Sequence, residues 1–146
     1  MIFKTHVVIS LLVALLVFPL FSLNKGIFLL IFLFAALLPD IDSPYSFFGR
    51  RIKVIGWIFR HRGIFHSFFM LAALSAVVWV LFNPLYALVF GLGYLAHLLI
   101  DMLTYKGIYL FYPLKYRIKG FIKTNSLSEK IIFVVCLVAG FVMLFK

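Results

Sequence analysis

The chain has 146 residues, of which 66% are hydrophobic and only 12% are charged. A soluble domain is about 45–50% apolar. This composition, with a mean hydropathy of +1.20, therefore excludes a soluble globular protein and predicts an integral membrane protein. A net charge of +10 would favour nucleic-acid binding in a soluble protein, but in a membrane protein the positions of the charges decide its meaning. The single cysteine, Cys136, has no disulfide partner in the chain, and we interpret it as a small apolar residue.

Five apolar segments follow one another, and a helix that crosses a bilayer needs about 20 such residues. They cover about residues 5–23, 25–39, 64–82, 84–104 and 130–145. The first is longer than the apolar core of a signal peptide and has no small-residue cleavage site after it, so we expect it to be a transmembrane helix. The sequence predicts an all-α fold: a polytopic membrane helix bundle of about five transmembrane helices, forming a single integral membrane domain over residues 1–146.

The distribution of basic residues predicts the orientation of this bundle. If the five segments alternate in direction, only Lys25 and Lys146 lie on one side of the membrane. The twelve on the other side are Lys4, Arg50, Arg51, Lys53, Arg60, Arg62, Lys106, Lys115, Arg117, Lys119, Lys123 and Lys130. The positive-inside rule then places the N-terminus and both long loops in the cytoplasm and the C-terminus outside, in the cell inner membrane. Because topology accounts for the charge, we expect no direct nucleic-acid binding.

Local signals predict where the first two helices begin and end. We expect the first helix to open at His6 and residues 24–26 to form a tight external turn. Pro39 disfavours a helical conformation at the residue before it and so ends the second helix. Asp40 and Asp42 are therefore expected on irregular backbone at a helix end, which at membrane depth persists only when it is buried in protein or lines a cavity.

The two long loops share a mixture of aromatic and basic residues. We interpret Tyr45–Arg62 as an interfacial helix and expect Tyr105–Lys123 also to lie at the interface, as loop or helix, both on the cytoplasmic side. Asn83, followed by a proline, resembles the N-cap of the fourth helix. Ser126 and Glu129 have the spacing of a capping box for the fifth helix, which gives Glu129 a structural role.

The remaining acidic residues and all histidines are predicted to meet on the cytoplasmic side. These seven residues are His6, Asp40, Asp42, His61, His66, His97 and Asp101. At about 1.5 Å per helical residue, the members at helix ends lie about 18–26 Å from the external boundary, inside a hydrocarbon core about 30 Å thick. We therefore expect the cluster to lie several ångströms below the cytoplasmic surface.

Ionisable groups at that depth are costly unless they are paired or bound to another group. His97 and Asp101 are four residues apart and share one helix face, and Asp40 and Asp42 offer two carboxylates from a bend. Imidazole and carboxylate groups are ligands of divalent metals. Seven ligands are too many for one four-coordinate zinc, so the sequence predicts one or two divalent ions that an aspartate can bridge. Zinc is the first choice, with manganese, iron or magnesium as alternatives.

The absence of a protein nucleophile indicates what such a metal would do. The chain has no Gly-x-Ser-x-Gly motif and no P-loop, so a water activated by the metal is the available attacking group. Asp42 and His61 are the candidate catalytic residues for proton transfer. Arg60 and Arg62, which flank His61, are the candidate catalytic residues that hold a phosphate through charge-assisted hydrogen bonds.

Structural interpretations compete with this one. The aspartates and histidines can instead form a buried salt-bridge network with Arg60 and Arg62. Asp40 can simply cap a turn. Ser67 and Thr104 can orient metal ligands, or can be ordinary hydroxyls at helix ends.

The motifs also resemble a known family. A histidine near the N-terminus, LLPDIDSP, HRGIFHS and GYLAHLLIDMLTYKGIYLFYP resemble the membrane-bound metal-dependent hydrolases known as LexA-binding, inner-membrane-associated hydrolases. The resemblance covers about residues 1–115 and includes the elements PDxD, HRxxxHS and HxxxD in that order. It implies a small polytopic prokaryotic membrane protein whose metal centre uses the seven residues above, and it says little about the substrate.

We therefore predict a membrane-embedded metal-dependent hydrolase of a phosphoester in a lipid or other amphiphilic, phosphorylated substrate at the cytoplasmic leaflet. Membrane lipids are expected partners, since each Lys or Arg near an anionic surface contributes about 1 kcal/mol of attraction. One alternative is a metal-ion or proton transporter, although segments 11–17 and 71–81 offer almost no polar residues for a path to the outer face. The other is a metal-stabilised scaffold that recruits a soluble cytoplasmic protein, which the family's link to a DNA-damage repressor implies.

Overall fold

The computed structural model describes residues 2–42 and 63–145 of the chain. This part is helical, with no named strand, which confirms the predicted fold class. The α-helices are α1 (Phe3–Val17), α2 (Lys25–Leu37), α4 (Phe68–Leu81), α5 (Pro84–Met102) and α6 (Leu127–Leu144). Short 3-10 helices cover Phe18–Leu20 after α1, Leu38–Asp42 after α2 and Ile64–His66 before α4. The predicted interfacial helix over Tyr45–Arg62 lies outside the described residues.

Three of the described helical segments, Phe3–Leu20, Pro84–Met102 and Leu127–Leu144, are long and apolar enough to cross a membrane. The other two helices are shorter, since α2 has 13 residues and α4 has 14. Large apolar side chains nevertheless point outward along α4, where Trp79 is 62% exposed and Val80 is 83% exposed. Apolar surface of this extent is stable in contact with lipid rather than water, which supports a membrane helix bundle.

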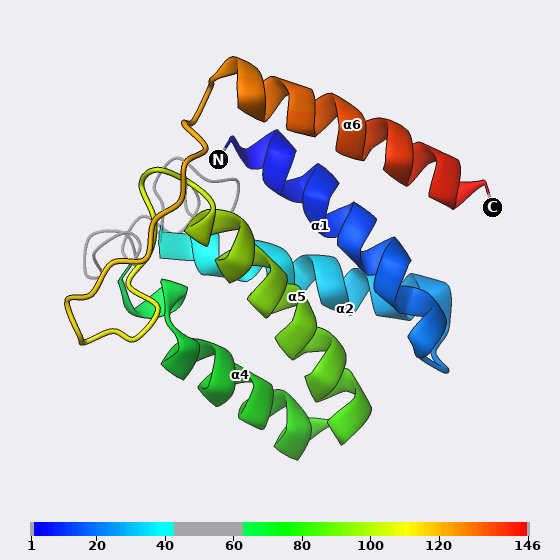
Figure 1. Ribbon diagram of the computed structural model, residues 1–146. Coiled ribbons are helices and arrows are strands. Elements are labelled where there is room, and N and C mark those ends of the chain that lie inside the picture. Colours follow the sequence, from blue (N-terminus) through cyan, green and yellow to red (C-terminus); the bar gives the residue numbers. More distant parts are fainter. Residues whose placement is uncertain (1, 43–62, 146) are drawn as a thin grey trace.

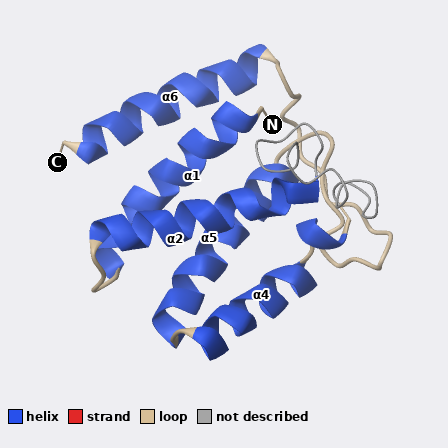
Figure 2. Cartoon of the chain, turned by 180° about the vertical axis from the view of Figure 1, so that it is seen from behind, coloured by secondary structure: helices blue, strands red, loops and turns tan. Residues whose placement is uncertain are grey.

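The helices run alternately up and down between the two ends of the bundle. Figures 1 and 2 show the N-terminus and the segment between α5 and α6 at one end, and the α1–α2 connection, the α4–α5 connection and the C-terminus at the other. Successive helices therefore alternate in direction, as the sequence predicts. The start of α1, the end of α2, the start of α4 and the end of α5 all lie at the same end of the bundle.

Helix α5 lies at the centre of the bundle and packs against α1, α2 and α4, whereas α6 packs against α1. Two clusters of buried side chains form the core, one made by Ala14, Phe28, Phe32, Val89 and Ala96, the other by Ala35, Phe90, Tyr94, Leu98 and Ile108. Gly93 permits the close contact between α2 and α5, because a Cβ atom there would lie 2.3 Å from the carbonyl oxygen of Phe32. The backbones of α2 and α5 therefore touch, which fixes the end of α2 beside the last two turns of α5.

The predicted starts of α5 and α6 are confirmed and that of α1 is wrong, and the turn expected at 24–26 also needs correction. Asn83 caps α5 by accepting a hydrogen bond from the Tyr86 N–H at 2.9 Å, and Ser126 caps α6. Asn24, in contrast, is the N-cap of α2 and accepts from the Gly26 N–H at 2.9 Å, so the expected turn at 24–26 is already the first turn of a helix. Helix α1 begins at Phe3 rather than at His6, which places His6 at the end of its first turn.

The segment between α5 and α6 is a loop with two isolated β-bridges, between Thr104 and Ile122 and between Ile108 and Ile118. Ile108 and Ile122 are buried, whereas the aromatic side chains of this loop, such as Phe121 at 85% exposure, face outward. That this loop lies at the membrane interface stays a prediction. It is supported by the loop's buried isoleucines and outward-facing aromatic rings, because aromatic side chains are common at membrane–water interfaces.

Replacing Gly93 by alanine is expected to lower the free energy of unfolding by about 1–3 kcal/mol, because the new Cβ would collide with the Phe32 carbonyl and force α2 and α5 apart. Gly140→Ala on α6 is the matched control. A Cβ there meets no atom within 4 Å, and alanine favours a helix over glycine by about 1 kcal/mol. Thermal unfolding in detergent measures both variants. A Gly93→Ala protein as stable as the wild type contradicts the close α2–α5 contact.

Candidate metal centre

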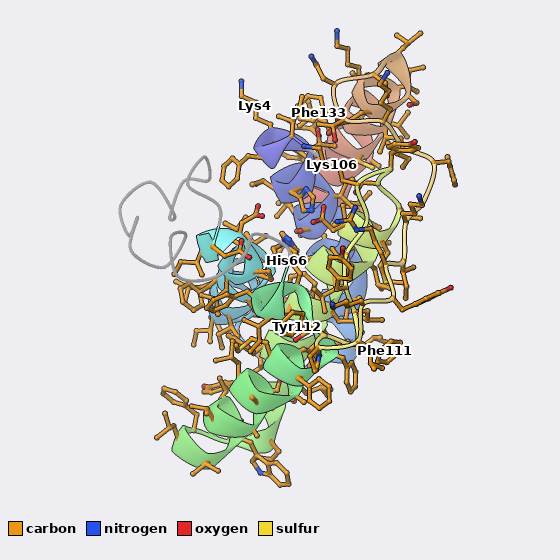
Figure 3. The ribbon with its side chains drawn as sticks, turned by 90° about the vertical axis from the view of Figure 1, so that its left-hand side faces the viewer. Lys4, His66, Lys106, Phe111, Tyr112 and Phe133 are labelled. Carbon is orange, nitrogen blue, oxygen red and sulfur yellow. The ribbon has the colours of Figure 1, made fainter. Side chains whose placement is uncertain are left out.

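The structure brings six of the seven predicted residues together at the polar end of the bundle. They come from four places: His6 from α1, Asp40 and Asp42 from the 3-10 helix after α2, His66 from the 3-10 helix before α4, and His97 and Asp101 from α5. In Figure 3, His66 lies where the end of α2 approaches the start of α4. Asp40 and Asp42 are thus on regular 3-10 backbone rather than the irregular backbone expected. The seventh residue, His61, and its neighbours Arg60 and Arg62 lie outside the described residues.

Burial differs sharply within the cluster. His66, His97 and Asp42 have no exposed surface, and His6 and Asp101 are each 2% exposed. The side chain of Asp40 is 22% exposed, so it is the most accessible of the six. Within the described residues, the cluster is therefore buried except at the side chain of Asp40.

A hydrogen bond to the end of α2 holds His97 in place. The Nδ1 atom of His97 lies 2.7 Å from the carbonyl oxygen of Ala36. Because a carbonyl oxygen only accepts hydrogen bonds, Nδ1 must carry the proton, and the lone pair of neutral His97 is then on Nε2. Nε2 faces the other members of the cluster, 3.9 Å from the Asp40 carboxylate. A histidine held through one ring nitrogen with the other free to bind is the usual arrangement of a metal ligand.

Two sets of three donors are close enough to bind a metal ion. One set is His6, His97 and Asp101, and the other is Asp40, His66 and His97, with the donor atoms of each set within 4.8 Å of one another. In the first set, His6 Nε2 lies 3.5 Å from Asp101 Oδ1. In the second, His66 Nε2 lies 3.8 Å from Asp40 Oδ1.

Asp101 belongs to the first set and also faces the second. Its Oδ1 faces His6, and its Oδ2 lies 3.6 Å from His66 Nε2. Because its two oxygens face different histidines, Asp101 would be able to donate to an ion in either set. The arrangement is thus compatible with the one or two ions that the residue count predicts, with His97 available to either.

Asp42 contacts the opposite side of the His66 ring from the other carboxylates. Its Oδ2 lies 3.4 Å from His66 Nδ1, whereas Asp40 and Asp101 face Nε2. Asp42 also belongs to neither donor set. This geometry favours Asp42 as the carboxylate that orients the His66 ring, a role common beside metal-binding histidines.

Unsatisfied buried nitrogens test whether these residues fit a metal. His6 Nε2 and His97 Nε2 are both buried and have no hydrogen-bond partner in the described part of the chain. A buried polar atom without a partner costs free energy, and a divalent cation satisfies both lone pairs at once. The residues present, imidazoles and carboxylates with two unpartnered imidazole nitrogens among them, therefore fit a divalent cation.

Sequence reasoning missed Tyr94. This buried residue lies three positions before His97 on α5, and its hydroxyl donates a hydrogen bond to the carbonyl of Phe65. Phe65 precedes His66 in the same 3-10 helix, so Tyr94 ties the backbone that carries His66 to α5. The spacing of three on a helix already places Tyr94 on the His97 face, but nothing in the sequence identifies its partner.

The two hydroxyls that the sequence left open are at helix ends. Ser67 Oγ accepts from the Met70 N–H at 3.3 Å and so caps α4. Thr104 Oγ1 donates to the Asp101 carbonyl at 2.7 Å, at the end of α5. These bonds fix the backbone next to His66 and Asp101, so both hydroxyls act on the cluster through the main chain.

A family model described as YdjM inner membrane protein matches residues 1–145. The chain belongs to this family. It is 43% identical over 96 residues to the inner membrane protein YdjM of Escherichia coli (strain K12) and to that of Shigella flexneri, covering 57% of this chain and 47% of each relative. It is 32% identical over 104 residues to the uncharacterized protein YvsG of Bacillus subtilis (strain 168), covering 66% of this chain and 65% of that one. No solved structure matches.

The chain spans about half the length of the YdjM relatives that it matches. Their names and the apolar helices support an inner-membrane location. They are consistent with the membrane-bound family that the motifs resemble. The names mention neither a metal nor a reaction, so metal binding, hydrolysis and the orientation of the termini stay predictions.

Tyr94→Phe is expected to remove one hydrogen bond without changing the shape of the core. The loss of stability is about 0.5–1.5 kcal/mol, and the His66 backbone is less well held. Tyr86→Phe on the same helix is the control, since the Tyr86 hydroxyl makes no hydrogen bond within the described part of the chain. Equilibrium unfolding of both variants tests this, and equal stabilities would contradict a role for the Tyr94 hydroxyl.

Proposed function

We propose that the chain is a metal-dependent hydrolase that cleaves a phosphoester in a lipid or other amphiphilic substrate. The observation that carries the proposal is the pair of buried donor sets that share His97. Two carboxylates and three imidazoles converge there from helices of an apolar bundle, where isolated ionisable groups are costly. The inner-membrane location of the family agrees with a substrate that is itself part of the membrane.

A bound divalent ion would supply Lewis acidity and lower the pKa of a coordinated water to near 7. The side chains that would hold the ion are those of the two donor sets: His6, Asp40, His66, His97 and Asp101. Ala36 holds the His97 ring through its carbonyl, and Asp42 orients the His66 ring from the opposite nitrogen. These contacts fix the ligands before substrate arrives, which lowers the cost of reaching the reactive arrangement.

Accessibility indicates the direction from which substrate reaches the cluster. Asp40 is the partly exposed member, so substrate enters beside the end of α2. The loop after α5 brings basic residues to the same end of the bundle, where the guanidinium of Arg117 stacks 4.7 Å above the Tyr109 ring. Positive charge around an opening of this kind attracts anionic headgroups. The positive-inside rule supports the cytoplasmic leaflet as the side on which the proposed reaction takes place.

The distribution of buried polar groups disfavours the transporter alternative. A transport path needs polar groups from one face of the bundle to the other. Most buried polar side chains of the described residues lie at the cluster end. The buried polar atoms farthest from that end are the hydroxyls of Ser10 on α1 and Ser75 on α4, and within the described residues no buried polar side chain continues the path beyond them. A buried cluster that opens at one end is better suited to chemistry than to passage.

The first test is elemental analysis of the detergent-purified protein. We expect near-stoichiometric divalent metal in the wild type and its loss in His97→Ala and Asp101→Ala. His97 belongs to both donor sets, and Asp101 belongs to one set and faces His66 of the other. Ser10→Ala is the matched control, since it removes a buried hydroxyl that belongs to neither set. Thermal unfolding confirms that each variant is folded. A folded wild type without metal after exposure to zinc or manganese would overturn the proposal.

The second test is hydrolysis by the metal-loaded protein of a panel of phospholipids and soluble phosphoesters. We expect turnover of an amphiphilic phosphoester. Asp42→Asn should weaken metal binding by about 10–100-fold because the His66 ring loses the carboxylate that orients it. A metal-loaded wild type that leaves the whole panel intact would contradict hydrolysis. Retained metal together with binding of a soluble cytoplasmic protein would then favour the scaffold.

A further inference from the structure

Glu129 is the one acidic residue outside the metal cluster, and it is 1% exposed. The predicted capping box explains only one of the three hydrogen bonds described here. Its backbone N–H donates to Ser126 Oγ at 3.4 Å, as an N-cap requires. The carboxylate instead accepts from the backbone N–H of Asn125 and, 127 positions away in sequence, from that of Ile2, both at 2.6 Å.

The bond to Ile2 determines where α1 begins. The carbonyl of Ile2 accepts from the N–H groups of Thr5 and His6 at 3.0 and 3.2 Å, so Ile2 is the N-cap of α1. The side chain of Ile2 has no acceptor, and a helix end frays more readily when its N–H groups are not held. Glu129 of α6 accepts from the Ile2 N–H at this end. A carboxylate beside a helix N-terminus is also favoured by the helix dipole.

His6 follows Ile2 by one helical turn, so the position of this turn sets the position of its ring. The His6 ring is 4.5 Å from the His97 ring between centroids, and its Nε2 is 3.5 Å from Asp101. Figure 3 shows Lys4 of α1 and Phe133 of α6 near each other, where the two helices pack along one another. Fraying of the first turn of α1 would therefore move His6 away from its donor set.

We propose that Glu129 is a positioning residue for the metal centre: its carboxylate holds the Ile2 N–H and thereby places His6 against Asp101 and His97. This inference rests on the proposed metal centre. It assigns to α6 a role beyond crossing the membrane, since α6 packs on α1 and fixes the α1 ligand through this one buried carboxylate.

The test compares Co²⁺ affinity in the full-length protein. Glu129→Ala should weaken Co²⁺ binding by at least about tenfold, whereas Ser126→Ala, which removes the N-cap of α6 but leaves the carboxylate, should bind as the wild type does. Glu129→Gln keeps one carbonyl oxygen for the Ile2 N–H and should recover part of the loss. Wild-type affinity in Glu129→Ala, or an equal loss in Ser126→Ala, would overturn the proposal.

A double variant separates positioning from general destabilisation. If Glu129 acts through His6, adding Glu129→Ala to His6→Ala should cost no further Co²⁺ affinity, because the group that it positions is already gone. A further loss in the double variant would show that Glu129 acts on the whole bundle and would overturn the proposal.

A metal-free measurement keeps this inference distinct from the proposed function. In the metal-free protein, the His6 ring resonances in NMR spectra should shift in Glu129→Ala, while those of His66 stay in place. If the wild type binds no metal but the His6 resonances shift in this way, the proposed function fails and the contact through Ile2 stands. If the wild type binds metal and the His6 resonances are unchanged in Glu129→Ala, the positioning role fails and the proposed function stands.

Discussion

The hydrogen bond between His97 and the Ala36 carbonyl joins the two helices on which the cluster depends. It lies at the end of α2, where helical N–H groups no longer satisfy the last carbonyls. The same bond fixes the tautomer of His97 and aims Nε2 at the carboxylates. The contact at Gly93, one turn earlier on α5, lets the helices approach closely enough for this bond to form. The close packing of α2 on α5 thus also sets the orientation of the His97 ring in the cluster.

Depth in the bundle explains why so few residues form the site. A bundle of apolar helices tolerates ionisable groups only where they neutralise one another or bind a cation. The short length of α2 and the 3-10 backbone after it bring Asp40 and Asp42 into the bundle end rather than to its surface. Asp101 and His97, on the last turns of α5, meet them there. The polar atoms are concentrated in one place, and the remaining helix surface is free to face lipid.

Much of the fold could be predicted because hydropathy and helix caps are local signals. The apolar segments located all five helices, and Asn83 and Ser126 marked the starts of α5 and α6. The start of α1 was predicted too late, because the group that caps it, Glu129, comes from the far end of the chain. Alternation of the helices also predicted which residues would meet. It could not predict that Asp42 faces a different ring nitrogen from Asp40, or that Tyr94 binds the Phe65 backbone, because both depend on side-chain conformations set by tertiary packing.

The contrast between Asp40 and its neighbours bears most directly on function. A purely structural polar network gains from complete burial, since water at one member weakens its interactions with the others. Here the carboxylate nearest the end of α2 stays partly exposed, while the histidines that it faces are sealed. A site that must exchange one ligand for substrate needs this asymmetry: rigid buried donors on one side and an accessible coordination position on the other. In the proposed function, this accessible position lies at the end of an apolar bundle, where the polar part of an amphiphile would reach it while its apolar part stays in the membrane.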